Sequence, residues 1–340
     1  MLINWLRSMK ACIFRTPGST AVLTMADLPL PTLRQDTELR VKLKAAGVNP
    51  IDTKIRGRGA FAPDAGLTVL GCDGAGVVEA VGDRVRRFSP GDEVWFCSGG
   101  LGGDRGNYAE YAVVQEQDVI LKPAQVSFVE AAAAPLVLIT AWEALYDRAR
   151  LAPHQRVLIH AGAGGVGHVA IQLAKLREAQ VATTISSEEK ARFVTHLGAD
   201  HCIYYSRMDF VQAIMVWTDN KGVDIAFDTV GKSVLSESFK AVKYGGDVVT
   251  LLAPAATTAW KTARDRNLRV NFELMLTPQL QPIAEARHHQ AQILANCAQW
   301  LEAGKLHIHV DQTFPLYQAA AAHEWIEQGR GFGKVVLTMD

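Results

Sequence analysis

The sequence has no excess of charge of either sign. Its 340 residues include 35 Lys and Arg and 35 Asp and Glu, so the formal net charge is zero. Proteins that bind nucleic acid usually carry a clear basic excess, often with a basic stripe on one face. Nucleic acid is therefore not expected as a partner of this chain.

Cysteine is scarce and scattered. The five cysteines stand at positions 12, 72, 97, 202 and 297, and no two of them form a Cys-x-x-Cys pair. This pattern argues against a disulfide framework and against a structural zinc site built from cysteines. Reduced thiols in a cytoplasmic protein are the simplest interpretation.

Long hydrophobic runs are also missing. The longest, Ala131 to Trp142, contains Pro135 and is too short to cross a bilayer, so no membrane association is expected. The first residues, Met1 to Arg7, lack the basic start, apolar core and cleavage site of a signal peptide. Met1 and Met9 are equally acceptable as the native start.

The most informative feature that is present is a glycine-rich run, Ala161 to Gly167. It follows Arg156–His160, which has the pattern of a short buried strand, and it precedes His168–Lys175, which has helical apolar spacing. A glycine motif in this strand–turn–helix context indicates a dinucleotide site, because the helix N-terminus offers N–H groups to phosphates.

Three of the glycines have separate expected roles. Gly162 is expected to allow the tight turn, Gly164 the approach of a pyrophosphate, and Gly167 the close packing of helix on strand. The residues expected to contact the cofactor in this run are Gly162, Gly164, Gly165, Val166 and Gly167.

The sequence divides into a strand-rich part and an alternating part. Up to about Lys122, short strands are separated by Gly, Pro and Asp, which is typical of a compact β-rich domain. After Pro123, helical and strand patterns alternate, which predicts βαβ units and a parallel sheet. The expected later strands are 157–160, 181–185, 223–228, 247–252 and 268–272, and the expected helices are 128–134, 141–150, 188–197, 232–242 and 281–303.

The tail returns to strand-like sequence at 307–310 and 334–337, and we expect it to rejoin the first domain. The predicted fold class is thus α/β, with residues 1–127 joined by 308–340 in the β-rich domain. Residues 128–307 form the predicted nucleotide-binding domain.

The residues after the second strand of the nucleotide motif favour NADPH over NADH. An NAD site normally places an acidic residue at that strand end, but here the segment reads Thr183 to Ser187, with Ser186 at the tip. Glu188 follows in the first helical turn, where carboxylates are common for dipole reasons alone. Lys190 could pair with a 2′-phosphate. The alternative is that Lys190 is an ordinary solvated charge.

At this point the chain resembles the zinc-free, zeta-crystallin-like quinone oxidoreductases, a branch of the medium-chain dehydrogenase/reductase superfamily. The run Gly47–Arg56 is similar to their N-terminal signature, and Ala161–Lys175 is similar to their nucleotide motif. Three further segments match in the right order: Gly74–Val78, Asp228–Gly231 and Gly333–Leu337. The resemblance implies a GroES-like catalytic domain, a Rossmann domain and an active cleft between them.

The resemblance also implies roles for individual residues. Asn49 and Asp52 are expected to face the nicotinamide side of the cleft, and Thr140 to lie near the nicotinamide end. Lys190 and Tyr205 are expected to approach the 2′-phosphate. Gly333 and Lys334 belong to a segment close to the nicotinamide. A homodimer is expected through the outer Rossmann strand at 270–272, which would cover an open sheet edge.

The same alignment of motifs argues against a catalytic metal. Asn49 stands where zinc-dependent relatives have their first Cys, and Gly71-Cys72-Asp73 stands where they have Gly-His-Glu. A catalytic zinc needs three protein ligands, so no metal is expected, and Cys72 is interpreted as a small packed residue.

Without a Lewis acid, the expected substrates are small molecules that are already electrophilic. Our leading hypothesis is hydride transfer from NADPH to a quinone or an α,β-unsaturated carbonyl. The proton donor stays open, because Lys54 stands where some relatives have an aromatic hydroxyl; it could donate a proton or anchor an anion, and a surface lysine is the default. Arg56 and Arg58 add positive charge near the expected cleft mouth.

Two other functions compete with this hypothesis. The nearest is reduction of an enoyl thioester, whose phosphate groups Arg56 and Arg58 could receive. The other is a non-catalytic structural or RNA-associating role, which some relatives have adopted. Balanced charge disfavours RNA, and the intact glycine motif disfavours a purely structural role.

Overall fold

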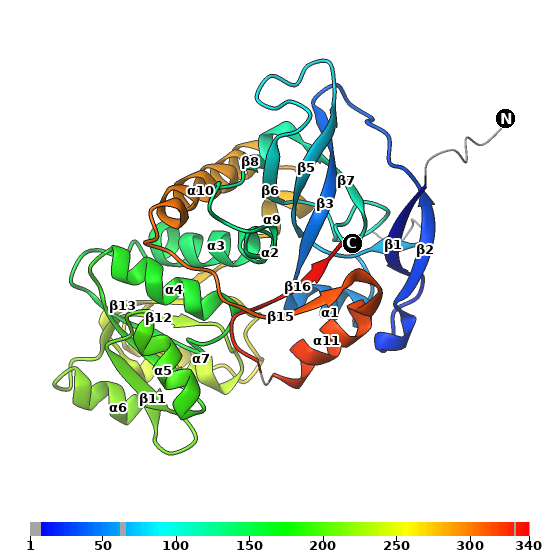
Figure 1. Ribbon diagram of the computed structural model, residues 1–340. Coiled ribbons are helices and arrows are strands. Elements are labelled where there is room, and N and C mark those ends of the chain that lie inside the picture. Colours follow the sequence, from blue (N-terminus) through cyan, green and yellow to red (C-terminus); the bar gives the residue numbers. More distant parts are fainter. Residues whose placement is uncertain (1–7, 62–65, 330, 340) are drawn as a thin grey trace. The chain divides into compact units, whose positions relative to one another are not determined.

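The chain forms two compact units (Figure 1). A computed structural model describes residues 8–61, 66–329 and 331–339, so the choice between Met1 and Met9 as native start lies partly outside the described residues. The first unit contains the described residues up to Leu136 and from Leu276 onward, and the second contains Val137–Met275. These bounds assign residues 276–307 to the first unit, whereas the sequence-based division assigned them to the nucleotide-binding domain.

The first unit is built on two sheets in which every strand pair is antiparallel except the parallel pair β15–β16. One sheet has seven strands in the order β15-β16-β3-β5-β6-β8, with β7 paired to β3, and a smaller sheet has the order β2-β1-β4. The strands are β1 (Ser8–Phe14), β2 (Thr24–Pro29), β3 (Glu38–Val48), β4 (Thr68–Val69), β5 (Asp73–Val81), β6 (Glu93–Cys97), β7 (Tyr111–Gln115), β8 (Val119–Leu121), β15 (Val310–Pro315) and β16 (Lys334–Thr338).

The sheet brings the tail of the chain back to its beginning. β16 pairs antiparallel with β3, with Val336 opposite Gly47 and Val335 opposite Val48. Alternating residues of β3, Leu39, Val41 and Leu43, pack into the core beneath. The result places Lys334 beside the start of the helix that follows β3.

The helices of this unit are α1 (Pro50–Arg58), α2 (Phe128–Ala133), α9 (Thr277–Leu280), α10 (Ala284–Glu302) and α11 (Ala319–Gln328), with 3-10 turns η1 (Thr20–Val22), η3 (Glu116–Asp118) and η5 (Leu316–Gln318). The sequence pattern indicated only strands before Lys122, so α1 was missed. Its signal is Asn49 before Pro50, because Asn favours the N-cap and Pro the first helical position.

The second unit is a parallel sheet with helices. Its six strands run in the order β11-β10-β9-β12-β13-β14, the doubly wound order, and every pair is parallel. The strands are β9 (Arg156–Ile159), β10 (Gln180–Ile185), β11 (His201–Tyr204), β12 (Val223–Asp228), β13 (Val242–Thr250) and β14 (Arg269–Phe272). The predicted α/β fold class, with a β-rich unit and a doubly wound parallel-sheet unit, is confirmed.

The helices of this part of the chain are α3 (Pro135–Trp142), which begins in the first unit, the π-helical turn η4 (Glu143–Arg148), α4 (Gly165–Leu176), α5 (Glu188–His196), α6 (Phe210–Trp217), α7 (Ser233–Ala241) and α8 (Trp260–Asp265). Buried residues of α6 and α7 pack with the strands in one core that includes Ile214, Phe239 and Leu158. None of the helices that the structure describes is long and apolar enough to cross a membrane.

Several sequence-based boundaries were wrong, and some elements were missed. The expected strand 307–310 is not a strand before Val310, where β15 begins. The expected helix from 281 starts at Ala284, because Pro282 restricts the residue before it. Strand β11 and helix α6 were not expected, since β11 has no regular alternation and its neighbours supply its pairing.

Candidate active site

The N-terminus of α1 places Asn49 and Asp52 in the interior of the first unit. The backbone N–H of Asn49 donates to Asp52 Oδ2 at 2.8 Å, which is the reciprocal half of a capping box. The N–H of Gly71 donates to Asp52 Oδ1 at 3.3 Å. Both side chains are fully buried. The spacing Asn-x-x-Asp is therefore, in the first place, a helix start.

Four buried side chains meet here, and we call Asn49, Asp52, Asp73 and Lys334 the Asn49 cluster. Asn49 Nδ2 donates to Asp73 Oδ2 at 2.8 Å. Lys334 Nζ donates to Asn49 Oδ1 and, at 3.1 Å, to the carbonyl oxygen of Val48. It also lies 3.9 Å from Asp73 Oδ2. The ammonium of Lys334 is thus directed inward, toward Asn49 and Asp73.

One ammonium serves two carboxyl groups in this cluster. Burial raises the pKa of Asp52 to about 7, against hydrogen bonds from Asn49 and Gly71 that favour the carboxylate. Burial raises the pKa of Asp73 to about 6, against the field of Lys334. Burial also lowers the pKa of Lys334, an effect opposed by Asp73 and then Asp52. The cluster consequently changes its protonation near neutral pH.

A second layer of polar groups continues from Asp52. Tyr108 Oη donates to Asp52 Oδ2 at 3.3 Å and lies 3.1 Å from Nε2 of His323 on α11. Burial, and then the nearby Arg56, lowers the pKa of His323 to about 3, so the imidazole is neutral at physiological pH. Sequence reasoning missed Tyr108 and His323, because 215 residues separate them.

Arg56 does not lie at an open mouth. Its guanidinium is buried in α1 and donates to Glu327 of α11 at 2.5 Å. Its expected role as surface charge was wrong, because α1 turns this face toward α11. Arg58 is exposed, as expected.

Lys54 is separate from the cluster. It is exposed on α1, on a different side of the helix from the buried Asp52 and Arg56. The structure therefore brings Asn49, Asp52 and Lys334 together and leaves Lys54 on the surface of the same unit.

The donors around the cluster do not form a metal site. Cys72 and Cys97 are buried close to Asp73, and burial raises the pKa of both thiols well above the ordinary value. In the part of the chain that the structure describes, no group of three or more His, Cys, Asp or Glu side chains could hold a metal ion. The cation inside this group of acidic side chains is the ammonium of Lys334.

In the second unit, the glycine run forms a turn between β9 and α4. The left-handed backbone falls on Ala161 (φ 50°) and not on Gly162. A Cβ on Gly162 would lie 2.0 Å from Thr183 Oγ1, and one on Gly167 would lie 2.3 Å from the Ala161 carbonyl oxygen. Gly162 and Gly167 are therefore needed for packing, and the expected turn role of Gly162 belongs to Ala161.

Gly164 differs from these two. A Cβ there would meet only the Ala161 carbonyl oxygen, at 3.2 Å, so its outer side is open. Gly164 is the N-cap of α4, and Gly165, Val166 and Gly167 form the first turn. N–H groups in a first helical turn have no acceptor within the helix. An open side and free N–H groups fit the phosphates of a dinucleotide.

The end of β10 leads to the expected 2′-phosphate residues. Ser186 is exposed, and Ser187 Oγ caps α5 by accepting from the N–H of Lys190 at 3.2 Å. Glu188 accepts from Tyr204 Oη at 2.7 Å and pairs with Arg207 at 3.4 Å. Glu188, the first carboxylate after the end of β10, therefore already has two partners, Tyr204 and Arg207.

Two residues that follow strand β11, Tyr205 and Arg207, lie near this segment. Tyr205 is 59% exposed and follows β11, with its N–H donating to the Ile185 carbonyl oxygen. Arg207 was missed from the sequence, since it becomes a neighbour of α5 only through the pairing of β10 with β11. The structure brings Ser186, Lys190 and Tyr205 to one end of the sheet.

Two expected residues remain, Thr140 and Gly333. Thr140 is buried on α3. Gly333 has φ 76°, a conformation that favours glycine, and directly precedes β16, where Lys334 begins the strand.

Comparison with known proteins decides the family. Residues 35–124 match the alcohol dehydrogenase GroES-like domain, and residues 197–337 match a domain described as zinc-binding dehydrogenase. The chain is 34% identical over 339 residues to 2-methylene-furan-3-one reductase of Solanum lycopersicum, covering 97% of this chain and 79% of the relative. It is 33% identical over 329 residues to quinone oxidoreductase of Pseudomonas aeruginosa, covering 95% and 98%. The chain belongs to the quinone oxidoreductase family of the medium-chain dehydrogenases/reductases.

Solved structures agree with this membership. Escherichia coli quinone oxidoreductase complexed with NADPH is similar with a TM-score of 0.86 and 27% identity, covering 97% of this chain and 99% of that one. As a member of the quinone oxidoreductase family, the chain is an oxidoreductase.

Proposed function

We propose that this oxidoreductase transfers a hydride from NADPH to a quinone or an α,β-unsaturated carbonyl, without a metal ion. One observation carries the metal-independent part. Asn49 takes the place of a metal-binding Cys, and its side-chain oxygen accepts from the ammonium of Lys334. A fixed ammonium is not a Lewis acid as Zn²⁺ is, and it cannot activate an isolated carbonyl in the same way. A substrate that is already electrophilic needs no such activation.

NADPH, when bound, supplies the hydride. The first turn of α4 and the open side of Gly164 would hold the pyrophosphate. Lys190, with Ser186 and Tyr205, would hold the 2′-phosphate. Glu188 accepts from Tyr204 and pairs with Arg207, and these partners compete with a free ribose 2′-hydroxyl for its carboxylate. The relative from Escherichia coli was solved with NADPH, which supports the same choice.

The names of two relatives support the substrate class. The tomato relative is called a 2-methylene-furan-3-one reductase, and 2-methylene-furan-3-one is an alkene conjugated to a carbonyl. The Pseudomonas aeruginosa relative is called a quinone oxidoreductase. Both acceptors take a hydride at a carbon made electron-poor by conjugation. The enoyl-thioester alternative loses one support, because Arg56 is buried and paired to Glu327.

The test is NADPH oxidation under single-turnover conditions with four acceptors: a quinone, an enone, an enoyl thioester and a saturated ketone. We expect oxidation by the quinone or the enone, and none by the saturated ketone, before and after dialysis against a chelator. Loss of activity on chelation together with bound zinc by elemental analysis would refute metal independence. Failure of both the quinone and the enone would refute the proposed reaction.

We propose further that the protein is a homodimer and resides in the cytoplasm. Strand β14 is the last strand of the six-stranded sheet, and Phe272 on it is 55% exposed. A second copy of this strand would cover the open edge and the ring. The cytoplasmic location rests on the cysteines, all five of which are free thiols.

A further inference from the structure

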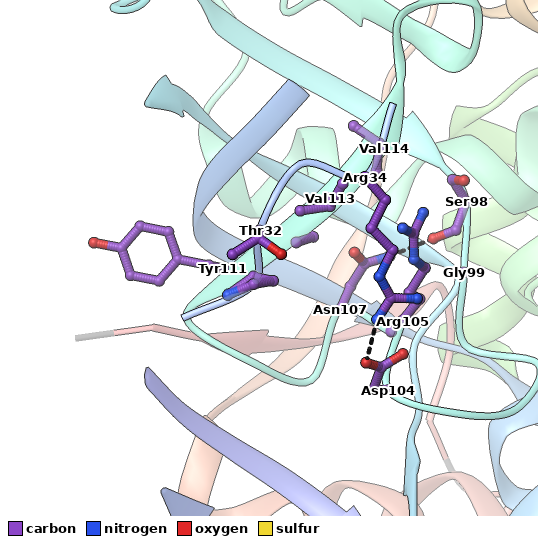
Figure 2. A pocket seen from close by; sticks show the side chains of 13 residues that line it. Thr32, Arg34, Ser98, Gly99, Asp104, Arg105, Asn107, Tyr111, Val113 and Val114 are labelled. Atoms are coloured by element: carbon purple, nitrogen blue, oxygen red, sulfur yellow. Dashed lines mark hydrogen bonds and ion pairs between the residues drawn. The ribbon is translucent and has the colours of Figure 1, made fainter. Parts of the chain in front are cut away.

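The first unit contains a polar hollow for which the proposed reaction has no use (Figure 2). The hollow is partly open to solvent, and about 30 Å³ within it is free for the centre of a water-sized molecule. Among its lining residues are Arg34, Ser98, Asp104, Arg105 and Asn107. Neither the Asn49 cluster nor the nucleotide turn contributes to this lining.

Two guanidinium groups line the hollow and retain free donors. Arg34 Nη2 donates to Asp104 at 2.8 Å, a pair in which both side chains are more than half exposed. Arg105 Nη1 donates at 2.7 Å to Glu38, whose carboxylate is fully buried. A guanidinium has five N–H donors, so each arginine keeps several that face other directions. Figure 2 shows both side chains extending into the same space.

Asn107 adds an acceptor of fixed orientation. Its Nδ2 donates to the carbonyl oxygens of Gly71 and Ser98, both at 2.9 Å. Two carbonyl partners require the nitrogen on that side, so the amide cannot be flipped. The side chain is 1% exposed, and its Oδ1 has no hydrogen-bond partner among the residues that the structure describes. A buried acceptor without a donor is costly, which indicates that a ligand or water supplies one.

We propose that this hollow binds a small oxyanion that carries its own O–H donor, such as hydrogen phosphate or an α-hydroxycarboxylate. The anionic oxygens would accept from Arg34 and Arg105, since guanidinium groups match phosphate and carboxylate geometry. The O–H would donate to Asn107 Oδ1. An anion without a proton satisfies the arginines but leaves the buried amide oxygen unpaired. The site therefore selects by the donor and not by charge alone.

Matched pairs of ligands test this selection by isothermal titration calorimetry on the full chain. Inorganic phosphate and sulfate are both tetrahedral, but only phosphate carries O–H at neutral pH. Glycolate and acetate differ by one hydroxyl group. We expect phosphate to bind at least tenfold more tightly than sulfate, or glycolate at least tenfold more tightly than acetate. The pair that shows the preference identifies which kind of oxyanion the site takes.

Variants then locate the binding. Arg34→Gln removes one guanidinium from an exposed pair, and we expect it to weaken binding at least fivefold without lowering the melting temperature. Arg264→Gln, an exposed arginine on α8 in the other unit, serves as the control and leaves affinity unchanged. Lys190→Ala also leaves it unchanged, which separates this site from the nucleotide site.

Three results would overturn the inference. They are no heat of binding for any of the four ions, equal affinities within both pairs (an adventitious ion only), and full affinity retained in Arg34→Gln. None of these results bears on NADPH oxidation, so failure here leaves the proposed reaction standing.

Discussion

Replacing Lys334 by Met should destabilise the first unit at pH 8 and much less at pH 5. At pH 8 both Asp52 and Asp73 are ionised, since their pKa values are about 7 and about 6. Lys334→Met then leaves two buried carboxylates without their cation. Loss of one partner from a buried pair costs about 3–5 kcal/mol. For a protein of this size that corresponds to a fall in melting temperature on the order of 10 °C.

The pH dependence follows from the sign of the carboxyl shifts. Each carboxyl has a folded pKa above its ordinary value of 3.8, so the folded state binds more protons than the unfolded state between these values. Stability from these groups is therefore present at low pH and is lost as pH rises toward 7, by about 4 kcal/mol for Asp52 and about 3 kcal/mol for Asp73. At pH 5 both are protonated, and Lys334→Met removes only the hydrogen bonds to Val48 and Asn49, at about 1 kcal/mol each.

The double variant Lys334→Met/Asp73→Asn is the internal control. Asp73→Asn alone leaves the ammonium of Lys334 with only one carboxylate, and the two changes together leave Asp52 as the one remaining charged group of the cluster at pH 8. At pH 8 we expect the double variant to lose about 2 kcal/mol less unfolding free energy than the two single variants lose together. Thermal unfolding followed by circular dichroism at pH 5 and pH 8 measures this. Equal losses at both pH values, or additive single effects, would refute the assignment of Lys334 as counter-ion.

Three further outcomes are expected. Lys190→Ala should weaken NADPH binding by roughly 10- to 100-fold and leave NADH binding unchanged, because a hydrogen bond to a charged group contributes about 1.5–3 kcal/mol. Fluorescence titration of both nucleotides measures this. An unchanged NADPH affinity would contradict the 2′-phosphate assignment. Gly167→Ala places a Cβ 2.3 Å from the Ala161 carbonyl oxygen and should lower the melting temperature. Gly164→Ala should leave the melting temperature unchanged and weaken NADPH binding. If both variants melt like the wild type, the packing role of Gly167 is wrong. Phe272→Lys on the edge strand β14 should convert the proposed dimer to a monomer, as measured by light scattering. The control Val216→Lys, at a side chain 80% exposed on α6, should not. A monomeric wild type would refute the edge-strand proposal.

The parts of the fold that local patterns control could be predicted. The second unit follows from strands and helices whose periodicity is visible in short windows, and the glycine run marks its first turn. Helix α1 was missed although Asn49 and Pro50 start it, because it is short and lies among segments with strand patterns. The long helix α10 was expected, but its packing against η3 and β8 in the first unit was not, since contact partners are distant in sequence.

The site shows the same division more sharply. Asn49, Asp52 and Lys334 could be singled out from motifs, and Ser186 and Lys190 from the missing carboxylate after β10. Their environment could not be predicted, because β16 reaches β3 from the other end of the chain. That pairing directs the ammonium of Lys334 inward onto Asn49.

By itself, the sequence determined the fold class, the nucleotide turn and the lack of a cysteine at the expected metal position, because each depends on residue type and short spacing. Only the tertiary structure decided that Lys334 neutralises a buried carboxyl cluster, that Tyr108 and His323 extend it, and that Arg56 is buried against α11. Burial and pairing across hundreds of residues set these charges. Desolvation acts on a side chain through its surroundings, and those surroundings exist only in the folded chain.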